Sequence, residues 1–119
     1  QFRDLKPLQP PKLQEVTLKI KTNIGKQYQV TQNAISLLTS KEGKIIPKQN
    51  FTLRQESLET KGLLKYPDKT EVVAGQMVLF ISDKEGLSDE FKIIYELSIP
   101  RDVYPGDYST TFTYSVSEI

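Results

Sequence analysis

Cysteine, histidine and tryptophan are all absent from the 119-residue chain. The first two absences exclude most zinc sites, iron–sulfur clusters, thiol nucleophiles and histidine-based catalytic triads, because each of these needs cysteine or histidine side chains. The absence of tryptophan argues against a carbohydrate-binding module that stacks sugars on aromatic rings. An excess of charge is missing too, since 16 Lys and Arg against 15 Asp and Glu give a net charge of +1. This balance excludes a strongly cationic protein that binds nucleic acid or a membrane surface through charge.

Long hydrophobic runs are also missing. The longest, residues 77–81, is far shorter than the roughly 20 apolar residues that a membrane helix needs. Residues 1–4 do not have the basic and then apolar character of a signal peptide. The chain is therefore either cytosolic or a mature secreted chain or excised domain. Because it starts at Gln1 and not at Met, we expect an extracytoplasmic protein whose signal segment is not in this chain.

The length and composition predict one domain with a modest core. Hydrophobic residues make up 37%, below the roughly 45–50% of an average globular chain. Residues 1–14 carry Pro7, Pro10 and Pro11, which exclude a helix and predict an extended arm or linker. A proline-rich docking motif is the alternative for this segment. We expect residues 15–119 to form the single folded domain.

The first half of the chain shows the two-residue period of β-strands. Val16, Leu18 and Ile20 alternate with polar residues, which predicts a half-buried strand. Residues 23–25 predict a turn, and residues 27–31 a returning strand. Residues 33–42 fit a short helix or a strand, and we favour the strand. Residues 61–75 predict mostly loop.

The second half predicts strands more clearly. Residues 77–81 form an apolar run, and residues 91–99 and 108–116 alternate between apolar or aromatic and polar side chains. This alternation places Tyr95, Tyr108 and Tyr114 on inward faces. About seven strands at 8–12-residue spacing predict an all-β fold, an antiparallel β-sandwich. A β-barrel and an α+β fold with one short helix remain open.

The last strand carries a resemblance to a known group of proteins. After Ile99-Pro100, residues 103–116 read VYPGDYSTTFTYSV. This segment resembles the closing hairpin of bacterial extracytoplasmic immunoglobulin-like modules and is similar to the end of spore-coat-U-type and archaic fimbrial subunit domains. The resemblance implies an immunoglobulin-like sandwich that is secreted, periplasmic or on the cell surface. It covers about a fifth of the chain and transfers no functional residue, and the disulfide of many fimbrial subunits has no counterpart here.

The sequence offers no catalytic constellation. Its serines lack a histidine base and a Ser-x-x-Lys pattern, and its glycines form neither GxGxxG nor a P-loop. The acid-rich residues 83–90 predict a solvated turn, with a calcium loop as the alternative. A hydrolase would need two carboxylates that face each other across a cleft, and the sequence places no such pair. We therefore predict no enzyme activity, no cofactor and no metal.

Two sets of residues are candidates for contact with a ligand or partner. Tyr66 and Tyr104 lie beside prolines in predicted loops, where their rings could meet a ligand. Val16, Leu18 and Ile20 lie on a strand that could be a sheet edge to which another chain adds a strand. We accordingly predict a structural or protein-interaction module, part of a surface or appendage protein. A module that binds carbohydrate or a small ligand is the alternative, and nucleic acid and a membrane span are not expected.

Overall fold

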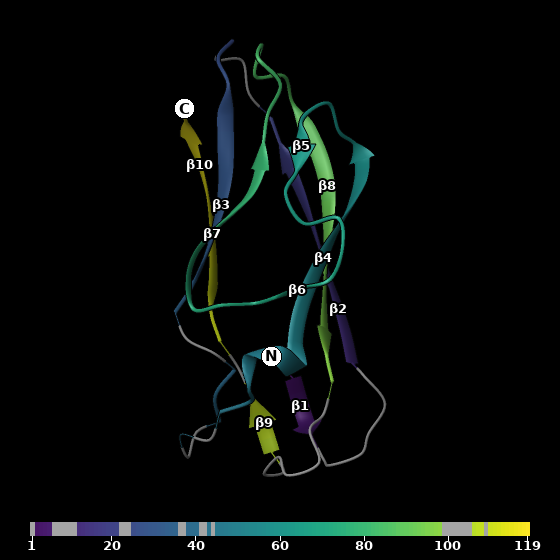
Figure 1. Cartoon of the computed structure of the whole chain (residues 1–119), viewed down its shortest axis with the longest axis vertical. Coiled ribbons are helices and arrows are strands. Elements are labelled where there is room, and N and C mark those ends of the chain that lie inside the picture. Colours follow the sequence, from purple (N-terminus) through teal and green to yellow (C-terminus); the bar gives the residue numbers. More distant parts are fainter. Residues whose placement is uncertain are drawn as a thin grey trace.

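The chain folds into two four-stranded antiparallel sheets that face each other (Figure 1). The structure is a computed structural model, and it describes residues 2–5, 12–21, 25–35, 38–40, 43, 45–98, 106–108 and 110–119. One sheet, here the β8 sheet, has the order β2 (Lys12–Ile20), β8 (Asp89–Leu97), β4 (Phe51–Glu59), β6 (Thr70–Glu71). The other, the β3 sheet, has the order β10 (Phe112–Glu118), β3 (Tyr28–Ala34), β7 (Gly75–Ile81), β5 (Leu63–Leu64). A separate antiparallel pair joins β1 (Phe2–Leu5) to β9 (Gly106–Tyr108), and the turn η1 spans Lys48–Asn50.

This architecture confirms the predicted all-β antiparallel sandwich. The two sheets contain eight strands where about seven were expected, because β5 and β6 are two-residue strands in a segment that was predicted as mostly loop. The first main strand, β2, begins at Lys12 and so takes its first residues from the segment expected to be an arm. Within the described residues, no helix has the length and apolar character needed to cross a membrane.

Successive strands alternate between the sheets. β2 lies in the β8 sheet, β3 in the other, β4 in the first again, and the pattern continues to β10. Residues 23 and 24 of the predicted turn lie outside the described residues. The strand expected to return after them, β3, lies in the opposite sheet and does not pair with β2. Strands that pair are therefore never consecutive in the main sheets.

The core forms where the inward faces of the sheets meet. On β8, Phe91, Ile93, Tyr95 and Leu97 are buried, as their alternation predicts. They pack against inward residues of the other strands, in a cluster that includes Tyr28, Val30, Phe51, Leu53, Leu79, Phe80 and Tyr108. Burying such side chains contributes about 1.5–3 kcal/mol each relative to exposure. The core is therefore built from the alternating residues of both sheets.

One residue of β8 departs from this alternation. Ile94 faces outward by its position and is nevertheless buried. The sheet register sets it directly between Glu15 of β2 and Arg54 of β4. Long charged side chains can cover an apolar neighbour with their aliphatic stems while their heads stay in water.

Residues 33–42 were expected to form a strand, and this is correct for Asn33 and Ala34, which end β3. The other described residues of this segment, 35 and 38–40, are neither strand nor helix, apart from an isolated antiparallel bridge between Thr39 and Ile45. β3 ends at Ala34, and the Ile35 N–H then donates to the Thr111 carbonyl at 3.2 Å. Further along, the Ile46 N–H donates to the Leu38 carbonyl at 3.0 Å, and both side chains are buried. The segment folds back on itself to cover the end of the core, so the tertiary contacts of Leu38 and Ile46 outweigh local strand preference.

Gly86, in the turn before β8, provides a direct test of this packing. It has a φ of +62°, and a Cβ there would collide with the backbone of Lys26. Gly43 also has a positive φ, of +82°, but faces open space. We expect Gly86→Ala to lower the free energy of unfolding by about 3 kcal/mol or more, and Gly43→Ala by about 1 kcal/mol. Urea unfolding followed by far-UV circular dichroism measures both, and equal losses would contradict the close approach of Gly86 to Lys26.

Candidate functional site: an open seam between β2 and β10

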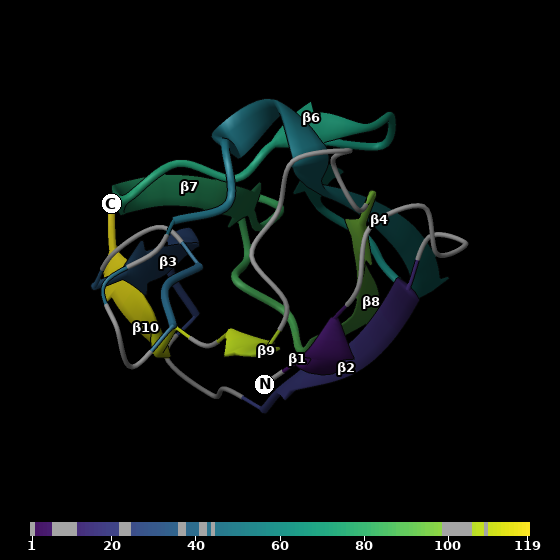
Figure 2. The same ribbon diagram turned by 90° about the horizontal axis from the view of Figure 1, so that it is seen from below.

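The sandwich is open along one side, between two edge strands. β2 ends the β8 sheet and β10 ends the β3 sheet, and their arrows point the same way in Figure 1. Seen from below in Figure 2, β1 and β9 are the described strands that lie between them, at one end of the molecule. We call the space between these two strands the seam, and its lining is Val16, Leu18 and Ile20 of β2 and Phe112, Tyr114 and Val116 of β10.

Two cavities follow one another along the seam. The lower one, of about 80 Å³, lies between Val16 and Phe112 and reaches the core at Phe51 and Tyr95. The upper one, of about 280 Å³, lies between Leu18 and Ile20 on one side and Tyr114 and Val116 on the other, with Val30 also in its lining. Inward side chains of β2 and β10 line both cavities, and Leu38, Phe51, Tyr95 and Thr110 complete the lining of the lower one.

On the opposite side of the sandwich, hydrogen bonds of the main chain connect the two sheets. After β5, the Lys65 N–H donates to the Leu79 carbonyl of the β3 sheet at 3.0 Å. The next residue, Tyr66, bonds to the β8 sheet instead: its carbonyl accepts from the Gln55 N–H at 2.9 Å, and its N–H donates to Gln55 Oε1 at 2.8 Å. Residues 65 and 66 thus tie the two sheets to each other through main-chain hydrogen bonds.

Aromatic stacking closes the core behind the lower cavity. The Tyr95 ring stacks on Phe112 with centroids 4.8 Å apart and planes at 12°, and on Phe51 at 5.9 Å and 25°. These rings come from β8, β10 and β4, so they join the two sheets. Stacked pairs of this kind contribute about 0.5–1.5 kcal/mol beyond the area that they bury.

A chain of polar groups crosses the seam between the two cavities. The Tyr95 hydroxyl donates to Gln32 Oε1, and the Tyr95 and Tyr114 hydroxyl oxygens lie 2.6 Å apart. Gln32 is fully buried and its Nε2 lies 3.8 Å from Met77 Sδ. Burial, followed by the bond to Tyr114, raises the pKa of Tyr95 well above its usual value, and burial also raises the pKa of Tyr114. Both hydroxyls therefore keep their protons at neutral pH.

A third cavity, of about 620 Å³, adjoins the upper end of the seam. It shares Lys19, Ile20 and Lys21 with the upper cavity and adds Glu59, Ser88, Asp89 and Glu90. Asp89 is only 3% exposed and accepts from the Lys61 N–H at 2.5 Å and from the Tyr28 hydroxyl at 3.3 Å. The described residues contain no cluster of acids that could hold a metal ion. The acid-rich turn thus uses Asp89 as a structural acceptor.

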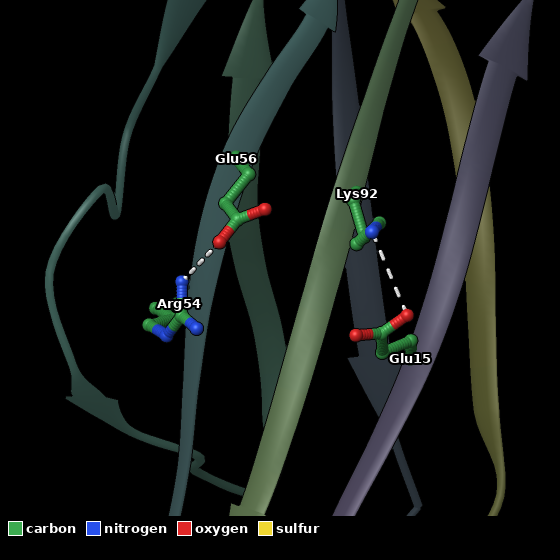
Figure 3. Close-up of polar contacts among 4 residues, drawn as sticks. All are labelled: Glu15, Arg54, Glu56 and Lys92. Atoms are coloured by element: carbon green, nitrogen blue, oxygen red, sulfur yellow. Dashed lines mark hydrogen bonds and ion pairs between the residues drawn. The ribbon is translucent and has the colours of Figure 1, made fainter.

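The outer face of the β8 sheet differs from the seam in its chemistry. Arg54 and Glu56 form an ion pair at 2.6 Å, and Lys92 and Glu15 one at 3.5 Å (Figure 3). A bond from Arg54 lowers the pKa of Glu56. Exposed pairs of this kind contribute little to stability, but they keep a sheet face hydrated.

The structure separates the residues that the sequence singled out. Val16, Leu18 and Ile20 do lie on an edge strand and line the seam. Tyr66 lies on the opposite side of the sandwich, where hydrogen bonds connect the two sheets, and it is half-buried against the core. Tyr104 lies outside the described residues. Sequence reasoning missed Gln32, although the inward alternation of Tyr28, Val30, Gln32 and Ala34 was the pattern that could have found it.

The buried tyrosines predict a loss of stability at alkaline pH. Tyrosines ionise near pH 10 in the unfolded chain, whereas Tyr95 and Tyr114 stay protonated in the fold. Their contribution is complete below pH 10 and falls above it, by up to about 1.4 kcal/mol per pH unit for each group. Tyr95→Phe should therefore make the decline between pH 10 and 11.5 shallower, as urea unfolding at each pH measures. Equal slopes for the two proteins would contradict the burial of this hydroxyl.

Comparison with protein-family models finds no match to this chain, and comparisons with curated proteins and with solved structures find none either.

Proposed function

We propose that the chain is a non-catalytic interaction module that binds an extended segment of a partner protein in the seam between β2 and β10. The observation that carries this proposal is the pair of edge strands that run in the same direction with apolar side chains and two cavities between them. A segment that runs antiparallel to both strands can pair with both at once. It would join the two sheets on their open side.

Edge strands supply the main-chain part of this interaction. Every second residue of an edge strand directs its N–H and C=O away from the sheet, towards the place of a further strand. A peptide that adds a strand gains affinity from these bonds and specificity from pockets that accept alternate side chains. In the seam, Val16, Leu18 and Ile20 face Phe112, Tyr114 and Val116, which provides such pockets on both sides.

Other described surfaces fit a partner strand less well. The outer face of the β8 sheet carries the ion pairs of Figure 3, and the side with β5 and β6 is already tied by the hydrogen bonds of Lys65 and Tyr66. Val116, in contrast, is 50% exposed at the upper end of the seam. An exposed apolar side chain beside a cavity is typical of an interaction site.

We further propose that the module works outside the cytoplasm, in a surface or appendage protein. The support for this compartment is the resemblance of residues 103–116 to the closing segment of extracytoplasmic immunoglobulin-like modules. The elongated shape, 49 Å by 23 Å by 18 Å, suits a module that is joined end to end with others.

Peptide binding tests the proposal directly. The probe is a fluorescein-labelled nonapeptide, Glu-Ser-Ile-Ser-Val-Ser-Val-Ser-Lys with blocked ends, whose apolar residues all face one side of a strand. We expect saturable binding in the micromolar range by fluorescence anisotropy, and at least about tenfold weaker binding to Val116→Arg, because a charge would be buried in the seam.

Two controls make this test specific. Ser117→Arg adds the same charge to the next residue of β10, on its exposed outer face, and should change the affinity less than about twofold. A peptide with proline in place of two outward serines lacks main-chain donors and should not bind. The proposal is wrong if the first peptide does not bind, or if the proline peptide or Val116→Arg gives the same affinity.

A further inference from the structure

The Tyr95 and Tyr114 hydroxyls interrupt the row of apolar side chains in the seam, which are Val16, Leu18, Ile20, Phe112 and Val116. They lie between the cavity at Val16 and Phe112 and the cavity at Leu18 and Val116. Any strand that occupies the seam places one inward side chain at this level, between the side chains that fill the two cavities. The hydrogen bonds already made by these hydroxyls decide what that side chain can be.

The hydrogens in this chain of polar groups point away from the seam. Gln32 Nε2 lies next to Met77 Sδ, a weak acceptor, so Oε1 is the atom turned to Tyr95. The single hydroxyl hydrogen of Tyr95 is used in the bond to Gln32, and the hydrogen between the two tyrosines must therefore come from Tyr114. The Tyr114 oxygen is left with acceptor capacity only, on a half-buried side chain that lines the seam. Because burial raises the pKa of Tyr114, this arrangement persists at neutral pH.

The two cavities differ in size, which sets the side chains on either side of this level. The upper cavity, at about 280 Å³, has room for a large aliphatic side chain, and the lower, at about 80 Å³, for a small one. The direction of the segment follows from β1, which runs antiparallel to β9 at the lower end of the seam. A strand in line with β1 is antiparallel to β10 and β2 and reaches the upper cavity first.

The positive charges of Lys19 and Lys21 at the upper end of the seam favour an acidic residue in the bound segment. Lys19 and Lys21 are both exposed and line the upper cavity, and among the described residues neither has an ion-pair partner. An acidic residue at the start of the bound segment would meet these two ammonium groups. Complementary charge of this kind orients a partner and speeds its association.

We propose that the segment bound in the seam has the pattern acidic residue, large aliphatic, hydroxyl or amide donor, small aliphatic, with the last three at alternate positions, and that Tyr114 accepts a hydrogen bond from the central donor. This inference rests on the proposed function and adds to it the identity of the segment. Tyr114 acts here as a specificity-determining residue, because an apolar central side chain would leave its oxygen without a donor after water is excluded.

A matched pair of peptides tests the inference. Glu-Ser-Ile-Ser-Thr-Ser-Val-Ser-Lys differs from the peptide described above only in a central threonine for valine, side chains of nearly the same shape. We expect the threonine peptide to bind wild-type protein about threefold more tightly, the effect of one hydrogen bond. With Tyr114→Phe, which removes the acceptor and keeps the ring, this preference should disappear. Tyr66→Phe, the same change on the opposite side of the sandwich, should leave the preference intact.

The outcomes separate this inference from the proposed function. If neither peptide binds, the proposed function is wrong and the inference falls with it. If both bind and the valine peptide is equal or better on wild-type protein, the seam binds strands but the central donor is wrong. If the threonine preference survives in Tyr114→Phe, Tyr114 is not the acceptor. A threonine preference that is lost only in Tyr114→Phe supports the inference.

Discussion

The alternation of successive strands between two sheets is the constraint on which the rest of this structure depends. β2 is the edge strand of one sheet and β10 is the edge strand of the other. The two edges that face each other therefore come from an early and a late part of the described sequence. No described strand follows β10 to cover them. The same alternation closes the other side, where residues 65 and 66 bond one to each sheet as the chain passes between them. The molecule is thus tied on one side and open on the other.

The open side remains ordered because its interior is held by aromatic and polar contacts. Tyr95 has a role in both: its ring stacks on Phe51 and on Phe112, and its hydroxyl joins Gln32 to Tyr114. Deletion of one member of such a buried network leaves the others without partners, which costs more than the bond itself contributes. The seam therefore combines a floor of packed side chains with the edge strands of both sheets, as a binding groove requires.

Much of the secondary structure could be predicted from the sequence, because a period of two residues shows directly in the alternation of β8 and β10. The same period placed Tyr95 and Tyr108 in the core and Val16, Leu18 and Ile20 on one face. It could not show which strands pair, since a side-chain pattern describes the faces of a strand and not its neighbours. Without the strand pairing, neither the seam nor the position of Tyr66 on the opposite side of the sandwich could be predicted. Gln32 was missed because a polar residue on an inward face has meaning only when its partners, here Tyr95 and Met77, are known.

The alternation of strands also has a consequence for the order in which the chain can fold during synthesis. Pairing in the main sheets always skips at least one strand, so no two consecutive strands of the described main sheets form a hairpin that could serve as an early local nucleus. β2 waits for β8, and β3 completes its pairing only when β10 has left the ribosome. Until then, apolar strands with unpaired edges are exposed together, a state in which chains aggregate readily. The topology that leaves the described sandwich open on one side thus also leaves the growing chain exposed until β10 is made.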